Sequence, residues 1–242
     1  MAASVVSDEP LSLLQITIRR SITTGRAALI YGSGVSVFLG IVLSLSSPTG
    51  FSAGFPIFLP IFATVGSMGG LTVFTGDRLK GVLEYLMAYG VSPRRLFLNI
   101  LLASLVLVTI VLGIALSVGL GIFLLRGNSF SDTLAFLLLL YALPMSYASA
   151  AFASTIGMYW TALSSPRQGL NSPLGVIPFI GILPSIATLG GVIALGIFGN
   201  DSAGSSFVKA TSISLTLVTV FVVVLLGRIG RLLRRERLLS PA

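Results

Sequence analysis

Six charged side chains lie close together in a chain that is otherwise poor in charge. The chain has 15 Lys and Arg and 7 Asp and Glu residues, and the segment Gly76–Arg95 contains Asp77, Arg78, Lys80, Glu84, Arg94 and Arg95. Lys80 and Glu84 are four residues apart, the spacing at which opposite charges attract on a helix. Since long apolar runs flank this segment, we expect it to meet water and another protein.

The residue types needed for most enzyme chemistry are missing from the sequence. There is no Cys and no His, which excludes disulfides, Cys/His metal sites, thiol nucleophiles and imidazole acid–base catalysis. No phosphate-binding Gly-x-x-x-x-Gly-Lys-Ser/Thr motif precedes either Lys80 or Lys209. We therefore expect no catalytic, metal or cofactor site on this chain, and no ATP hydrolysis by the chain itself.

The composition indicates an all-α membrane protein. Hydrophobic residues make up 55% of the 242 residues, charged residues 9%, and the mean hydropathy is +1.03. A helix needs about 20 mostly apolar residues to cross a bilayer, so six crossings fit. We expect a cytoplasmic segment at 1–26, one transmembrane domain at 27–232 and a basic cytoplasmic tail at 233–242.

Six apolar runs separated by short connections define the expected spans. The first two are joined by an uncharged turn, Pro48–Gly50, and Pro144 is expected to kink or locally unwind the fourth. The fifth is expected to be interrupted by Pro178, Pro184 and the pair Gly190–Gly191. The predicted spans are Ala27–Ser47, Phe55–Thr75, Leu96–Leu125, Thr133–Leu163, Pro173–Phe198 and Phe207–Leu226.

The distribution of basic residues predicts the orientation in the membrane. Thirteen of the fifteen Lys and Arg residues precede span one, lie in the charged segment, follow span four or belong to the tail, whereas only Arg126 and Lys209 fall on the other side. Cytoplasmic loops are enriched in Lys and Arg. We expect a plasma-membrane protein with both termini cytoplasmic, and no nucleic-acid binding, because the basic residues are not interleaved with exposed aromatic residues on a soluble face.

A further amphipathic helix is predicted at Pro10–Thr24, before the first span. Asp8 suits its N-cap and Pro10 its first turn. A helix with one apolar stripe is expected to lie flat on the cytoplasmic leaflet. The alternative is a solvated helix packed on the protein's own loops. The stripe consists of Leu11, Leu14, Ile18 and Ile22.

The charged segment itself predicts a short helix at about 77–90 and a new helix after it. Asp77 suits the N-terminal end of the short helix, and Gly90 suits the left-handed position that closes it. Ser92 and Pro93 suit the N-cap and first residue of the next helix. The alternative is an interfacial helix without a partner. The apolar face of the short helix consists of Leu79, Val82, Leu83 and Leu86.

This segment resembles the connection between spans two and three of type-2 ATP-binding-cassette (ABC) transporter permeases. Val82 stands where that family commonly has Thr, and Lys80 where an acidic residue is frequent. The six spans, the N-terminal amphipathic helix and the chain length extend the resemblance over nearly the whole chain. The matching positions are Gly81, Leu83, Glu84, Leu86 and Pro93.

The resemblance implies the permease half of an ATP-driven exporter. Two copies, or this chain and a similar permease, would form a twelve-span assembly with two ATP-binding subunits, which would hold the ATP and Mg²⁺. The 77–90 segment would be the coupling helix that contacts the ATPase. Leu83 and Leu86 are expected to pack either into the partner's cleft or back on the spans. The implied contact residues are Asp77, Arg78, Lys80, Leu83, Glu84 and Leu86.

Two other functions fit the composition: a secondary transporter or channel, and a membrane scaffold that does not transport. Ion-coupled transporters usually place an ionisable group near the bilayer midplane. The predicted spans put Asp77 and Glu84 on the cytoplasmic side and Asp132 and Asp201 on the outer side, with Glu236 in the tail. This arrangement counts against ion coupling.

Hydroxyl groups in spans four and six are candidates for a substrate path. They either line that path or hydrogen-bond to their own helix or to a neighbouring one. A path of this composition favours a hydrophobic or amphiphilic cargo. Gly113, Ser117 and Gly121 form a ridge of small residues that is expected to let another helix approach. The path candidates are Ser146, Tyr147 and Ser149 in span four and Ser212, Thr216 and Thr219 in span six.

Overall fold

The computed structural model describes residues 10–45, 48–130, 132–163, 177–198 and 203–234, and these residues contain helices and no strand. The helix before the first predicted span has the predicted bounds, Pro10–Thr24. The fourth predicted span consists of two α-helices joined by a π-helical turn. In order the elements are α1 (Pro10–Thr24), α2 (Arg26–Leu45), α3 (Pro48–Leu79), α4 (Val82–Ala88), α5 (Pro93–Leu125), α6 (Asp132–Leu137), the π-helical turn (Leu138–Ala142), α7 (Leu143–Leu163), α8 (Ile177–Phe198) and α9 (Ala203–Arg234).

Six of these helices are long and apolar enough to cross a membrane, which equals the predicted number of spans. They are α2, α3, α5, the α6–α7 helix, α8 and α9. α3 is the central one, since 67% of its most apolar stretch is buried, against 22% for α2. It contacts α2, α5, α7 and α8. The all-α class and the six helices are compatible with a multi-pass membrane protein.

The long helices differ from the predicted spans in several respects. α3 begins at Pro48, so Pro48–Gly50 form its first turn and the prediction of a turn there was wrong. Proline is tolerated in a first turn because the N–H that it lacks would have no partner there. α8 runs without interruption from Ile177 to Phe198, although it contains Pro184. α9 continues to Arg234, so the predicted basic tail begins on a helix.

The predicted disturbance at Pro144 is present as a π-helical turn at Leu138–Ala142, directly before α7. Pro144 has no N–H to donate to the carbonyl four residues earlier, and a wider turn accommodates that loss. The turn contributes Leu138 and Tyr141 to the core. It therefore places the two halves of the fourth span against α3.

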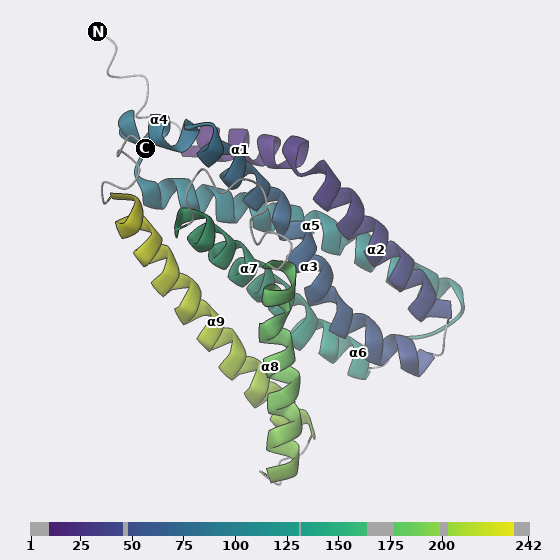
Figure 1. Cartoon of the computed structure of the whole chain (residues 1–242). Coiled ribbons are helices and arrows are strands. Elements are labelled where there is room, and N and C mark those ends of the chain that lie inside the picture. Colours follow the sequence, from purple (N-terminus) through teal and green to yellow (C-terminus); the bar gives the residue numbers. More distant parts are fainter. Residues whose placement is uncertain (1–9, 46–47, 131, 164–176, 199–202, 235–242) are drawn as a thin grey trace.

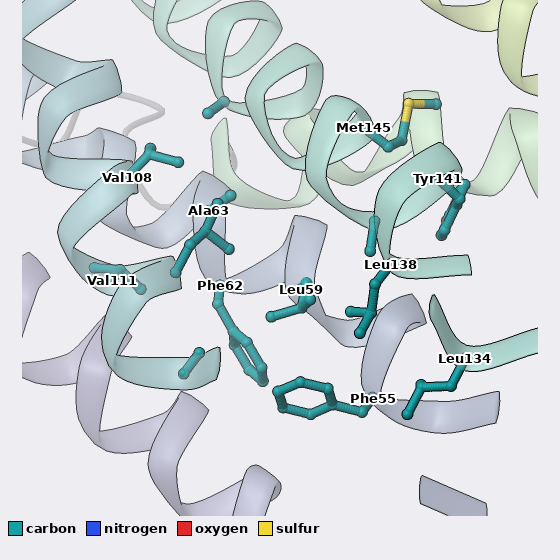
Figure 2. Close-up of a cluster of buried hydrophobic side chains, with 14 of the residues drawn as sticks. Phe55, Leu59, Phe62, Ala63, Val108, Val111, Leu134, Leu138, Tyr141 and Met145 are labelled. Carbon is teal, nitrogen blue, oxygen red and sulfur yellow. The ribbon is translucent and has the colours of Figure 1, made fainter. Parts of the chain in front are cut away.

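The main hydrophobic cluster lies between α3, α5 and the α6–α7 helix, as Figure 2 shows. Phe51 of α3 stacks on Phe55 with ring centroids 4.8 Å apart and on Phe123 of α5 at 4.6 Å. Such offset pairs add to the free energy of apolar burial. The labelled side chains are Phe55, Leu59, Phe62 and Ala63 of α3, Val108 and Val111 of α5, Leu134 of α6, Leu138 and Tyr141 of the π-helical turn, and Met145 of α7.

Small residues bring α2 close to α5, but not the ones predicted. A Cβ on Gly40 would lie 3.3 Å from the Cα of Gly119. No described helix of this chain packs on the predicted ridge of α5, because Cβ atoms on Gly113 and Gly121 would meet nothing within 4 Å. The close approach uses another face of the same helix. The buried face of α2 repeats every four residues as Gly32, Ser36, Gly40 and Ser44.

The charged residues are separated between the two ends of the helix bundle. α1, α4 and the C-terminal end of α9 lie at one end, as Figure 1 shows. Arg126 lies at the other end, where its Nη1 donates to the carbonyl of Ser44 near the end of α2. A cation at a helix C-terminus is favourable, because unpaired carbonyls point outward there. The bundle therefore has one strongly basic end, where α4 lies.

Candidate functional site

The connection from α3 to α4 depends on one left-handed glycine. α3 continues through Asp77 to Leu79, and Gly81 then adopts φ 68° before α4 begins at Val82. The N–H of Gly81 donates to the carbonyl of Arg78 at 3.2 Å. Side chains disfavour this backbone region, so glycine suits the position. The helix predicted at 77–90 is shorter than expected. Asp77 lies in the last turn of α3 instead of at the start of α4.

The C-terminal end of α4 is closed as predicted. Gly90 has φ 85°, and its N–H donates to the carbonyl of Met87 at 3.0 Å. The N–H of Val91 donates to the carbonyl of Leu86 at 3.1 Å. These two bonds form a Schellman motif. The prediction of a left-handed closing residue at Gly90 is confirmed.

α5 then begins directly after this turn, also as predicted. Ser92 is its N-cap, and the Ser92 Oγ accepts a hydrogen bond from the N–H of Arg95 at 3.4 Å. Pro93 occupies the first helical position. With a cap on both sides of the turn, the path from α4 into α5 is fixed by local hydrogen bonds.

The inner face of α4 packs against the ends of α3 and α5. Leu83 is 3% exposed and lies in a cluster with Phe74 of α3 and Phe97 of α5, whose rings are 5.2 Å apart. Leu86 and Met87 are partly buried against the same cluster. Of the two predicted possibilities for Leu83, the structure shows packing on the spans.

The outer face of α4 carries two tyrosines that the sequence interpretation missed. Tyr85 and Tyr89 are 61% and 64% exposed, and their ring centroids are 4.5 Å apart. The hydrogen bond with Tyr89 holds the pKa of Tyr85 above its ordinary value of 10.0. Leu79 and Lys80 are exposed beside them. The sequence did contain a signal for this pair, because Tyr85 and Tyr89 are four residues apart and therefore share the helix face opposite Leu83.

Asp77 is held by a residue far away in the sequence. The Arg20 guanidinium of α1 donates from Nη1 to the Asp77 Oδ2 at 2.9 Å and from Nη2 to the Oδ1. The Asp77 side chain is 7% exposed and that of Arg20 44%. Arg78 is also buried. Asp77 therefore faces α1, although it was predicted to contact a partner.

The six predicted contact residues thus divide by burial. Lys80 is exposed, Leu86 is half-buried, and Asp77, Arg78 and Leu83 are buried. Glu84 lies within α4, and its side chain lies outside the described part of the structure. We give the name α4 outer face to four exposed residues: Leu79 and Lys80 before the helix, and Tyr85 and Tyr89 on it and at its C-cap.

The predicted path residues of α7 have hydrogen-bond partners within the fold. Ser146 is buried and donates to the carbonyl of Ala142 in the turn before it. Ser149 is hydrogen-bonded to Ser185 of α8 at 3.2 Å. Tyr147 is hydrogen-bonded to Thr109 of α5 at 2.9 Å. Ser149 and Tyr147 thus join α7 to neighbouring helices, and Ser146 bonds within its own span, which is the second of the two roles considered for these groups.

The predicted path residues of α9 have different surroundings. Ser212, Thr216 and Thr219 are exposed. Thr216 donates to the carbonyl of Ser212 at 2.8 Å, and Thr219 to that of Leu215 at 2.7 Å. The hydroxyls of Thr216 and Thr219 are thus satisfied by their own helix, as is common in apolar surroundings. The six candidate residues therefore do not line a single substrate path within this chain.

Among the described residues, the carboxylates lie at helix ends. Asp77 is in the last turn of α3, and Asp132 is exposed at the start of α6. No group of His, Cys, Asp or Glu within the described ranges could hold a metal ion. Asp8, Asp201 and Glu236 lie outside these ranges. The middle of the six long helices, as far as described, carries no carboxylate.

Together the fold and the connection through α4 define a helical protein with six potential membrane spans and a short capped helix at its basic end. A comparison with protein-family models finds no match, and comparisons with curated proteins and with solved structures find none either.

Proposed function

We propose that this chain is the permease subunit of an ATP-driven ABC exporter. Two permease chains form the substrate path, and α4 of each couples to a separate ATP-binding subunit that binds and hydrolyses ATP. The observation that carries the proposal is α4 itself, a capped helix between two long apolar helices, with Leu83 buried and Tyr85 and Tyr89 exposed.

The packing of α4 supports a mechanical role. A simple connection between two antiparallel spans needs only a few turn residues. Here Leu83 is buried in the same hydrophobic cluster as Phe74 and Phe97, so a force on α4 passes into the ends of α3 and α5. Since α3 is the central helix of the bundle, that force reaches the contacts of four other long helices.

The α4 outer face supports a protein partner. Tyrosine is enriched at the centres of protein interfaces, where a large flat ring adds contact area at a small entropic cost. Tyr85 and Tyr89 form one such surface beside Lys80. We therefore propose these three residues and Glu84 as the main contacts of the ATP-binding subunit. Asp77, Arg78 and Leu83 support α4 from within.

The charge distribution supports a cytoplasmic position for α4. The basic end of the bundle contains α1, α4 and the end of α9. Cytoplasmic surfaces of membrane proteins are rich in Lys and Arg. α1 then lies at the cytoplasmic leaflet of the plasma membrane, with Gln15 and Arg19 exposed.

The exposed hydroxyls of α9 support an assembly of two permease chains. Ser212, Thr216 and Thr219 lie on the surface of a single chain, so they can line a path only where a second chain closes it. Their own hydrogen bonds stay within α9. A path of methyl groups and satisfied hydroxyls suits a hydrophobic or amphiphilic cargo.

Co-purification combined with reconstituted transport tests the proposal. We expect an ATPase with a phosphate-binding loop to purify with this chain, and Tyr85→Ala, Tyr89→Ala and Glu84→Lys to reduce ATP-driven transport. Tyr31→Ala is the matched control, because Tyr31 is 70% exposed on α2, away from α4. Normal assembly and transport in all three α4 variants contradict the coupling role. Transport driven by an ion gradient without an ATPase favours a secondary transporter, and absence of transport favours a scaffold.

A further inference from the structure

We infer that the ion pair between Arg20 and Asp77 positions α4 for its partner, so that α1 sets how well ATP hydrolysis is coupled to transport. This inference rests on the proposed function. Asp77 lies one turn before Gly81, the residue at which α3 gives way to α4. A contact that fixes the Asp77 side chain therefore fixes the last turn of α3, from which α4 extends.

The geometry of the pair restricts orientation as well as distance. Both Nη atoms of Arg20 donate to the two carboxylate oxygens of Asp77. A bidentate pair holds the two groups in one plane, which a single hydrogen bond does not. Asp77 has 7% of its side chain exposed, so little solvent reaches its carboxylate to replace the hydrogen bonds from Arg20.

A second contact joins the C-terminal end of α1 to α3 at a different position along α3. α1 ends at Thr24, and a Cβ on Gly25 would lie 2.6 Å from the Cα of Gly69, so the two backbones touch. At 1.5 Å per residue, Gly69 and Asp77 are about 12 Å apart along α3. Two contacts at this separation prevent α1 from pivoting about either one.

These contacts make α1, the end of α3 and α4 one unit. α3 has no break between Gly69 and Leu79, and Leu83 fixes α4 to the same end. When a partner pushes on the α4 outer face, the Arg20–Asp77 pair resists rotation of the last turn of α3. Without the pair, the last turn of α3 rotates when α4 is pushed, and less of the movement is transmitted to the membrane-spanning helices.

The neighbouring Arg19 provides a matched control. It is on the same helix, carries the same charge and is exposed. We would compare Arg20→Gln, Asp77→Asn, the double variant, Arg20→Lys and Arg19→Gln in vesicles containing the chain and its ATP-binding subunit. The measurements are the affinity for that subunit, the rate of ATP hydrolysis and the amount of cargo moved per ATP.

We expect cargo moved per ATP to fall about tenfold in Arg20→Gln and Asp77→Asn, with the affinity for the ATP-binding subunit within about twofold of wild type. The double variant should be no worse than either single one, because both remove the same interaction. Arg20→Lys should recover part of the coupling, since it keeps the charge but not the bidentate geometry. Arg19→Gln should behave as wild type.

A structural role alone would lower the amount of folded protein and leave cargo per ATP unchanged. That result in Arg20→Gln, or an equal loss in Arg19→Gln, overturns the inference. If Asp77→Asn does not fold, the comparison of Arg20→Gln with Arg20→Lys decides. If the wild-type chain binds no ATP-binding subunit, the proposed function fails. If it binds one and Arg20→Gln couples normally, only the present inference fails.

Discussion

Tyr85 and Tyr89 lie side by side on the outer face of α4, with ring centroids 4.5 Å apart and more than half of each side chain exposed. They are on the opposite side of the helix from Leu83, which is buried. α4 therefore has one buried face and one exposed face, so the proposed partner contact can be tested separately from the folding of the chain.

The first prediction concerns the outer face. Tyr85→Ala and Tyr89→Ala should leave the free energy of unfolding within about 0.5 kcal/mol of wild type, because the side chains are exposed. They should weaken binding of the ATP-binding subunit by about 10- to 100-fold, the range for a central interface tyrosine. Thermal unfolding and a binding titration measure the two effects. Equal binding by Tyr85→Ala and the control Tyr31→Ala would contradict the prediction.

The second prediction concerns the inner face. Leu83→Ala should destabilise the chain by about 2 to 5 kcal/mol, since it leaves a cavity in the hydrophobic cluster that contains Phe74 and Phe97. Leu79→Ala, at a position that is 48% exposed, should have little effect. Unfolding in detergent measures both. A similar stability for the two variants would mean that α4 is not packed as described.

The third prediction concerns the left-handed turn between α3 and α4. Gly81→Ala should cost about 1 to 2 kcal/mol, because a side chain disfavours φ 68°. Gly113→Ala is the control, since a Cβ there meets nothing within 4 Å and alanine is the better helix former. It should be neutral or stabilising. If both substitutions are tolerated equally, Gly81 does not have the described conformation.

The fourth prediction concerns the titration of the tyrosine pair. The hydrogen bond with Tyr89 raises the pKa of Tyr85, so folding favours the protonated phenol. The stability that this bond contributes is fully present below the ordinary pKa of 10.0 and is lost as the pH rises through the raised value. A spectrophotometric titration should show Tyr85 ionising at lower pH in Tyr89→Phe. An unchanged titration would exclude the hydrogen bond.

The features that the sequence predicted well are those with local signals. The bounds of α1, the closing glycine Gly90 and the start of α5 at Ser92 and Pro93 follow from capping and helix periodicity. The six long helices follow from apolar length. Each of these depends on residues that are close together in the chain.

The features that the sequence did not predict depend on distant residues. Asp77 suits a helix N-terminus in isolation, but it lies in the last turn of α3 and is paired with Arg20, 57 positions away. Likewise, two faces of α5 carry small residues, and the position of α2 decides that Gly119 rather than Gly113 is the buried one. Periodicity identifies faces but does not say which helix covers them.

Cross-linking from α4 tests the central claim most directly, because the chain has no cysteine and each introduced thiol is unique. Tyr85→Cys and Tyr31→Cys both replace exposed tyrosines, one on α4 and one on α2. A bifunctional thiol–amine reagent should join Tyr85→Cys to the ATP-binding subunit and leave Tyr31→Cys unlinked. Equal yields from the two positions, or no link from Tyr85→Cys in a complex that hydrolyses ATP, would contradict the assignment of α4 as the coupling helix.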